Sequence, residues 1–168
     1  MKKIPHLLLI LFLPSMVLSQ ETRTEELSEV VVTAVNYKYL SSTDAEEIPI
    51  PVKLLKRKVA AYDVTQSELY EDDYPFYTVS FYIPEGKIVA VYDEEGNIIK
   101  TIERFKDLQL PKEVETALKK RYKGWEAVED VYLIEYNNKK GVNRTFKVTL
   151  IKGKKTQKVK LDETGRFL

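Results

Sequence analysis

The sequence has no cysteine, a single histidine and only 6 glycines in 168 residues. Without cysteine there is no disulfide framework, no thiol nucleophile and no Cys-ligated metal centre. The one histidine, His6, lies in an N-terminal segment that we expect to be removed, so a Ser–His–Asp triad is excluded from the remaining chain. Neither G-x-x-x-x-G-K-[ST] nor G-x-G-x-x-G occurs. We therefore predict a non-enzymatic protein with no cofactor and no metal ion.

The first 19 residues have the pattern of a secretory signal peptide. Two lysines precede an apolar run over residues 7–13, and Val17 and Ser19 occupy the −3 and −1 positions of a small-residue cleavage site. The run is too short to span a bilayer, and no cysteine follows it that could carry a lipid anchor. We predict cleavage before Gln20 and a periplasmic or secreted protein with no membrane span after cleavage.

The remaining chain is close to neutral. Removing Lys2 and Lys3 from the 27 basic residues leaves 25 against 26 acidic ones. A balanced charge of this kind does not favour nucleic-acid binding. We expect an unknown envelope or secreted protein as the partner, and a monomeric chain.

Hydrophobic periodicity predicts alternating helices and strands. Apolar residues at helical spacing predict helices over 52–62 and 111–124, each beginning next to a proline. Period-two alternation between short turns predicts antiparallel strands. These strands cover 77–83, 88–93, 98–103, 128–136, 145–151 and 156–161. The turn after the second strand, Asp93–Asn97, contains three carboxylates; we interpret them as turn residues rather than as a Ca²⁺ site or an acid–base pair.

The two halves of the chain share a weak internal repeat. Tyr77, Val79 and Phe81 align with Phe146, Val148 and Leu150, and the two D-x-x-G turns align as well. The fold class that follows is α+β, with two tandem units, each a helix packed on an antiparallel β-meander sheet. The expected organisation is a signal peptide (1–19), an N-terminal strand and polar linker (20–47), a first unit (48–107) and a second unit (108–168).

The second unit resembles the PepSY-like domain family. The resemblance lies in the helix opening Leu110-Pro111-Lys112-Glu113-Val114, in Trp125 near the helix end and in the closing turn Asp162–Gly165. It covers residues 108–168 well and 48–105 loosely. It implies a fold similar to the β-lactamase inhibitor protein, an exported protein, and a binding or inhibitory role without shared catalytic residues.

A basic region near the C-terminus is the main candidate for a binding site. Residues 139–160 contain no acidic side chain, and alternation predicts that much of the charge lies on one sheet surface. The candidate partner-binding residues are Lys147, Lys152, Lys154, Lys155, Lys158 and Lys160, with Tyr132 and Tyr136 on the outer face. We favour a protein partner bound through a sheet face. The alternative is an envelope protein that binds an anion or a glycan through the lysines, and a third interpretation is a solvated face whose lysines prevent edge aggregation.

Two further features allow two interpretations each. The Val-rich segment 28–35 is either an extra strand of the fold or a strand that pairs with another protein's sheet edge. Trp125, the only tryptophan, either packs beneath the second helix or is exposed as a ligand contact.

Overall fold

The computed structural model describes residues 36–44, 48–68, 70–71 and 73–168, and its elements confirm the α+β class. The helical elements are α1 (Tyr37–Thr43), α2 (Ile50–Ala61), the short 3-10 helix η2 (Val64–Gln66) and α3 (Lys112–Arg121). The strands are β1 (Phe76–Ile83), β2 (Gly86–Asp93), β3 (Ile98–Lys106), β4 (Glu126–Asn137), β5 (Gly141–Lys152) and β6 (Lys155–Leu161). All six predicted strands and both predicted helices are therefore present.

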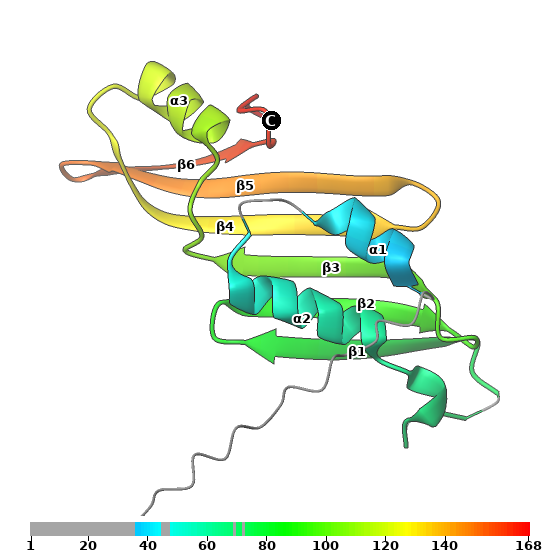
Figure 1. The fold of residues 1–168 in the computed structure, drawn as a ribbon. Coiled ribbons are helices and arrows are strands. Elements are labelled where there is room, and N and C mark those ends of the chain that lie inside the picture. Colours follow the sequence, from blue (N-terminus) through cyan, green and yellow to red (C-terminus); the bar gives the residue numbers. More distant parts are fainter. Residues whose placement is uncertain (1–35, 45–47, 69, 72) are drawn as a thin grey trace, which may run out of the picture.

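The strands form one antiparallel sheet in the order β1-β2-β3-β4-β5-β6. Four of the five connections between neighbouring strands are direct, and α3 lies in the fifth, between β3 and β4. Figure 1 shows α1 and α2 in front of the sheet and α3 beyond β5, near β6. The pairing of β3 with β4 runs across the predicted boundary at 107/108, so the sheet is continuous there. The finer prediction of two tandem units is not confirmed.

Alternation along each strand decides which side chains enter the core. In β2, Ile88, Ala90 and Tyr92 are fully buried, whereas the residues between them are not. Because successive side chains of a strand point to opposite faces, these three residues define the face that carries the helices. The core is a single cluster of buried residues on that face, and it includes residues of all six strands and of α1, α2 and α3.

Helix α2 covers β1 and β2 because its apolar residues recur at helical spacing. Pro49 precedes its first residue, and Val52, Leu55 and Val59 are buried against the sheet. Helix α3 is shorter and buries Val114 and Leu118. Its acidic residues lie in the first turn and its basic residues in the last turn, which complements the helix dipole.

Helix α1 corrects the predicted linker. Residues 41–43, assigned to a polar linker from their composition, are the last turn of α1. The sequence YKYLSST has little intrinsic helix propensity, so contacts with the rest of the fold stabilise this helix. Asn36 precedes it, fully enclosed: its Nδ2 donates to the carbonyls of Ala60 and Gly96, and its Oδ1 accepts from the Ile98 N–H. The predicted strand 28–35 lies outside the described residues.

A buried polar network joins α1 and α2 to the sheet. Lys56 Nζ of α2 lies 3.1 Å from Glu103 Oε2 of β3, and both side chains are almost completely buried. Tyr39 of α1 donates its hydroxyl to Glu103 Oε1 at 2.9 Å, and Thr101 donates to the same oxygen. Lys56 also donates to the carbonyl of Thr43 at 2.6 Å. These bonds fix both helices relative to β3.

The network changes the acid–base properties of its members. Burial lowers the pKa of Lys56, and the neighbouring Glu103 carboxylate opposes that shift. Burial raises the pKa of Tyr39, and the same carboxylate raises it further. Tyr39 therefore remains a hydrogen-bond donor throughout the physiological pH range.

Two equivalent turns, one in each half of the predicted repeat, have the same pattern of backbone hydrogen bonds. At Asp93 the N–H donates to the carbonyl of Asn97, and the Gly96 N–H donates back to the Asp93 carbonyl. At Asp162 the equivalent bonds involve Arg166 and Gly165. Both glycines have positive φ, 81° and 79°, which favours glycine at that position. The interpretation of Asp93–Asn97 as a hairpin turn is confirmed.

Candidate binding face

The side of the sheet opposite the helices is the candidate binding face, and we call it the open face. It comprises the strand residues that alternate with the core residues, and no described helix lies on it. The register of the strands aligns its side chains in rows. One row runs Tyr82, Lys87, Arg104, Leu133 and Thr145, from β1 to β5.

Positive charge predominates on the open face. A second row runs Lys106, Val131, Lys147 and Lys160, from β3 to β6. The cations of the open face are Lys87, Lys100, Arg104, Lys106, Lys147, Lys158 and Lys160, and its carboxylates are Asp93, Glu126, Glu129 and Glu135. Two of these carboxylates accept hydrogen bonds from neutral side chains across the strands, Glu129 from Thr149 and Glu135 from Asn143. No ion pair between these carboxylates and the cations occurs among the described residues.

Two of these lysines are placed against each other at a cost in stability. Lys147 and Lys160 lie directly opposite one another on β5 and β6, on the same face. Like charges in such a cross-strand pair are destabilising. The pair is therefore not explained by stability.

Apolar side chains lie among the cations. Tyr82 is 68% exposed and Ile102 is 42% exposed. Ile102 lies next to Val89 across the β2–β3 pairing. An exposed aromatic ring next to Lys87 and Arg104 is suited to contact with another molecule, because aromatic residues and arginine are enriched in interfaces.

The open face is hollowed along β4, β5 and β6. One hollow is lined by Leu133, Glu135, Asn143, Thr145, Lys147, Lys160 and Leu168. The next is lined by Arg104, Glu129, Val131, Thr149 and Lys158, with the same two lysines. Lys147 and Lys160 thus separate two neighbouring hollows and line both of them. Both lysines are therefore available to a molecule bound in either hollow.

The predicted lysines are distributed over three places. Lys147, Lys158 and Lys160 lie on the open face, as alternation predicted. Lys154 and Lys155 lie at the exposed β5–β6 turn. Lys152 is directed toward the helix side, where its Nζ donates to the carbonyl of Lys123 after α3. The structure therefore brings only part of the predicted set together.

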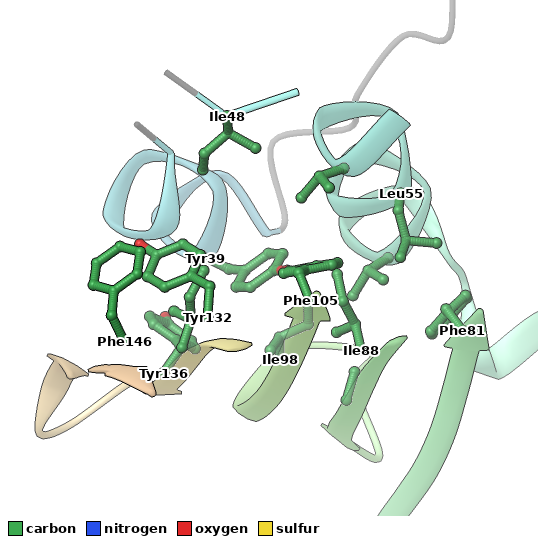
Figure 2. Packing of buried hydrophobic residues seen from close by; sticks show 14 of the residues in the cluster. Tyr39, Ile48, Leu55, Phe81, Ile88, Ile98, Phe105, Tyr132, Tyr136 and Phe146 are labelled. Atoms are coloured by element: carbon green, nitrogen blue, oxygen red, sulfur yellow. The ribbon is translucent and has the colours of Figure 1, made fainter. Parts of the chain in front are cut away.

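The placement of Tyr132 and Tyr136 on an outer face is wrong. They are 6% and 2% exposed, and they point toward α1. Figure 2 shows both rings on the helix side of the strands, close to Tyr39 and Phe146. The Tyr132 ring stacks on Phe146 at 4.4 Å, and Tyr136 packs edge-on against Tyr39 at 5.4 Å. Burial raises the pKa of Tyr132 to about 12.

Sequence reasoning missed the cations that come from the first three strands. Lys87, Arg104 and Lys106 lie on the open face together with Lys147, but they do not form a run in the sequence. Alternation within each strand indicates to which face of the sheet each of these side chains points. The strand order needed to bring them together was not available from alternation alone.

A half-buried carboxylate lies at the end of β4, on the helix side. Burial, with smaller contributions from the charges of Asp107 and Glu129, raises the pKa of Asp130 to about 6. Its Oδ2 has no hydrogen-bond partner. Within the described residues there is no group of three or more His, Cys, Asp or Glu side chains arranged to hold a metal ion.

Comparisons with known proteins place the chain only broadly. No protein-family model matches it, and no curated protein matches it. It is similar to the solved structure of a BLIP-like protein from Bacteroides fragilis, with 23% sequence identity and a TM-score of 0.35. The similarity covers 58% of this chain and 68% of that chain. Within the described residues, no helix has the length and apolarity needed to cross a membrane.

Proposed function

We propose that this protein is an exported, non-enzymatic binding module that engages an acidic protein surface through the open face. The observation that carries the proposal is the row of cations on that face, above all the opposed pair Lys147 and Lys160. This pair is destabilising where it lies, and a carboxylate from a partner placed between the two ammonium groups would relieve the repulsion.

A protein partner fits the chemistry of the face better than a small molecule does. The cations extend from Lys87 on β2 to Lys160 on β6, across the width of five strands. Exposed Tyr82 and Ile102 lie among them. Apolar and aromatic contacts combined with charge complementarity are characteristic of protein interfaces, where the charges set specificity and association rate.

Export and the tandem organisation belong to the same proposal. The signal-peptide pattern of residues 1–19 supports delivery to the periplasm or the exterior. The matching hydrogen bonds of the Asp93 and Asp162 turns support the view that residues 48–107 and 108–168 are two PepSY-like units. Their sheets would then be joined edge to edge, which creates a face wider than a single unit provides.

The test uses charge reversal with a matched control. The exported chain, starting at Gln20, is immobilised and used to capture proteins from an envelope extract. K147E/K160E reverses two charges on the open face, whereas K120E/K123E reverses two exposed charges on and just after α3. We expect a specific protein that is captured by the original chain and by the control but at least ~10-fold less by K147E/K160E. Equal capture by both variants would contradict the proposal.

The alternative function is binding of an anion or a glycan, and the two hollows that share Lys147 and Lys160 favour it specifically. Ionic strength separates the two functions. Binding of a sulfated polysaccharide such as heparin to these lysines should weaken steeply between 50 mM and 500 mM salt, because exposed charges are screened. Docking of a protein that also buries Tyr82 and Ile102 should retain much of its affinity over that range.

A further inference from the structure

The two edges of the sheet are protected very differently. At β6 the edge carries Lys155, Lys158 and Lys160, and the last residues of the chain cover part of it. Phe167 forms a bridge with Leu161, and the Leu168 N–H donates to the carbonyl of Lys160. Lysines and a covering segment are two of the devices by which natural sheets prevent unwanted pairing.

The β1 edge has neither device among the described residues. Its sequence, FYTVSFYI, contains no charged residue and no proline. It consists mainly of aromatic and β-branched residues, and Phe76 and Tyr82 are 59% and 68% exposed. A long, uncharged, apolar edge of this kind is a template for another strand. The β1 edge is therefore a candidate site for an added strand.

The register shows which backbone groups face away from β2. Ile83 and Gly86 pair across the two-residue turn, so they exchange backbone hydrogen bonds, and every second pair along the hairpin does the same. The N–H and C=O groups of Phe76, Thr78, Ser80 and Tyr82 therefore point outward. These are the groups that an added strand would bond.

We propose that the Val-rich segment Ser28–Val35 of this chain crosses to the outer edge of β1 and that its residues Ser28–Val32 pair there as an antiparallel strand. Its sequence, SEVVVTAV, has the β-branched composition of a strand and no proline. Its direction fits as well. Asn36 is fixed at the β2–β3 turn by Gly96 and Ile98, at the end of the sheet where β1 begins. A segment that ends at Asn36 therefore approaches β1 from the opposite end of the strand, which is the antiparallel direction.

The length of the segment is also sufficient. Neighbouring strands are about 4.8 Å apart, so the new strand would lie roughly 10 Å from β2, beyond β1. An extended chain covers ~3.3 Å per residue, and three residues before Asn36 span that gap. Ser28–Val32 then remain to pair with β1. This inference is independent of the proposed function, because it concerns the edge of the sheet and not the open face.

The test is amide hydrogen exchange measured by NMR on the exported chain from Gln20. We expect the outward amides of Thr78 and Ser80 to exchange at least ~100-fold more slowly than unprotected amides. V31P removes a donor and breaks the added strand, so it should abolish this protection. The control is T24P, a proline in the same N-terminal region but outside the strand, and it should leave the protection intact.

The possible results of the exchange experiment either support or overturn the pairing of the segment with β1. The core amides of Ile88 and Phe105 report whether V31P leaves the fold unchanged, and β1 protection that is lost while these stay protected supports the pairing. Rapid exchange of these two outward amides in the original chain would overturn it. Protection that appears only with rising protein concentration, together with a dimer in sedimentation, would also overturn it and identify a second copy as the occupant.

Discussion

The two faces of the sheet use the same type of residue for opposite purposes. On the helix side, Lys56 is 2% exposed and its ammonium group is bonded to Glu103 and to the Thr43 carbonyl. On the open face, Lys147 and Lys160 are exposed and oppose each other. Lys56 is paired within the fold, whereas the repulsion between Lys147 and Lys160 lowers the stability of the fold. The surroundings of a lysine, and not its position in a basic run, therefore decide whether its charge is used within the fold or remains available to a partner.

The largest effect should come from breaking the buried pair. E103A leaves the Lys56 ammonium without its counter-charge in the core, and we expect the free energy of unfolding to fall by about 3–5 kcal/mol. Urea unfolding followed by circular dichroism measures the change. The control is the double variant K56M/E103L, which removes both charges and should recover most of the loss. Equal losses in the single and double variants would show that the charge is not the cause.

A smaller loss should follow from removing one bond of the same network. Y39F keeps the ring in the core but deletes the hydroxyl that donates to Glu103 Oε1. A hydrogen bond to a charged group contributes about 1.5–3 kcal/mol, so we expect a loss in that range by urea unfolding. Y82F removes a hydroxyl on the open face and should change stability little. If the two phenylalanine variants behaved alike, the contrast between the faces would not hold.

The half-buried Asp130 is intermediate between the buried charges of the helix side and the exposed charges of the open face, and its titration can be measured. Its folded-state pKa, about 6, lies above its unfolded value near 3.8, so between these pH values the folded state binds the additional proton. Its contribution therefore favours folding below about pH 4 and is lost as pH rises through 6. We expect a loss of about 1 kcal/mol, below the full value of the shift because solvent reaches the carboxylate.

D130N removes this titration. The measurement is the free energy of urea unfolding as a function of pH, for D130N and for the original chain. The difference in unfolding free energy between D130N and the original chain should grow in favour of D130N from pH 4 to pH 7. A difference that stays constant over this range would show that Asp130 is solvated like an ordinary surface carboxylate.

The smallest effect should be a gain. K160E converts the Lys147–Lys160 repulsion into an attraction across β5 and β6, and we expect about 0.2–1 kcal/mol of added stability. Thermal unfolding is the measurement, and K154E at the exposed β5–β6 turn, where no strand partner lies opposite, is the control. The same variant should bind the partner less well. Stability that rises while binding falls would separate the two properties on a single residue.

The helices and strands could largely be predicted because their signals are local. Alternation located every strand, and apolar spacing with a preceding proline located α2 and α3. Helix α1 was not predicted, because it is stabilised by hydrogen bonds from Asn36 and Tyr39 to residues distant in the sequence and not by its own composition. Local signals also do not determine which face of a strand is buried when both faces are apolar.

Strand β4 illustrates this limit for the candidate site. Val131 and Leu133 alternate with Tyr132 and Ile134, so the pattern supports either orientation. Only the position of α1 decides that the tyrosine side is buried. Likewise, Arg104 and Lys147 share a face because β3 and β5 flank β4, and that order is a property of the assembled sheet.

The strand order also has a consequence for the sequence of folding events. Every strand pairs with its neighbour along the chain, and four of the five pairings close a short loop, so β1–β3 and β4–β6 can each form hairpin by hairpin. The β3–β4 pairing closes a longer loop that contains α3. Helix α1 is the exception, because Lys38 bonds to Asn138 and Arg144 bonds to Ser42 across about a hundred residues. These contacts require β4 and β5 to be in place. We therefore expect α1 to dock late in folding and to shield the Lys56–Glu103 pair from water only after the sheet beneath it has formed.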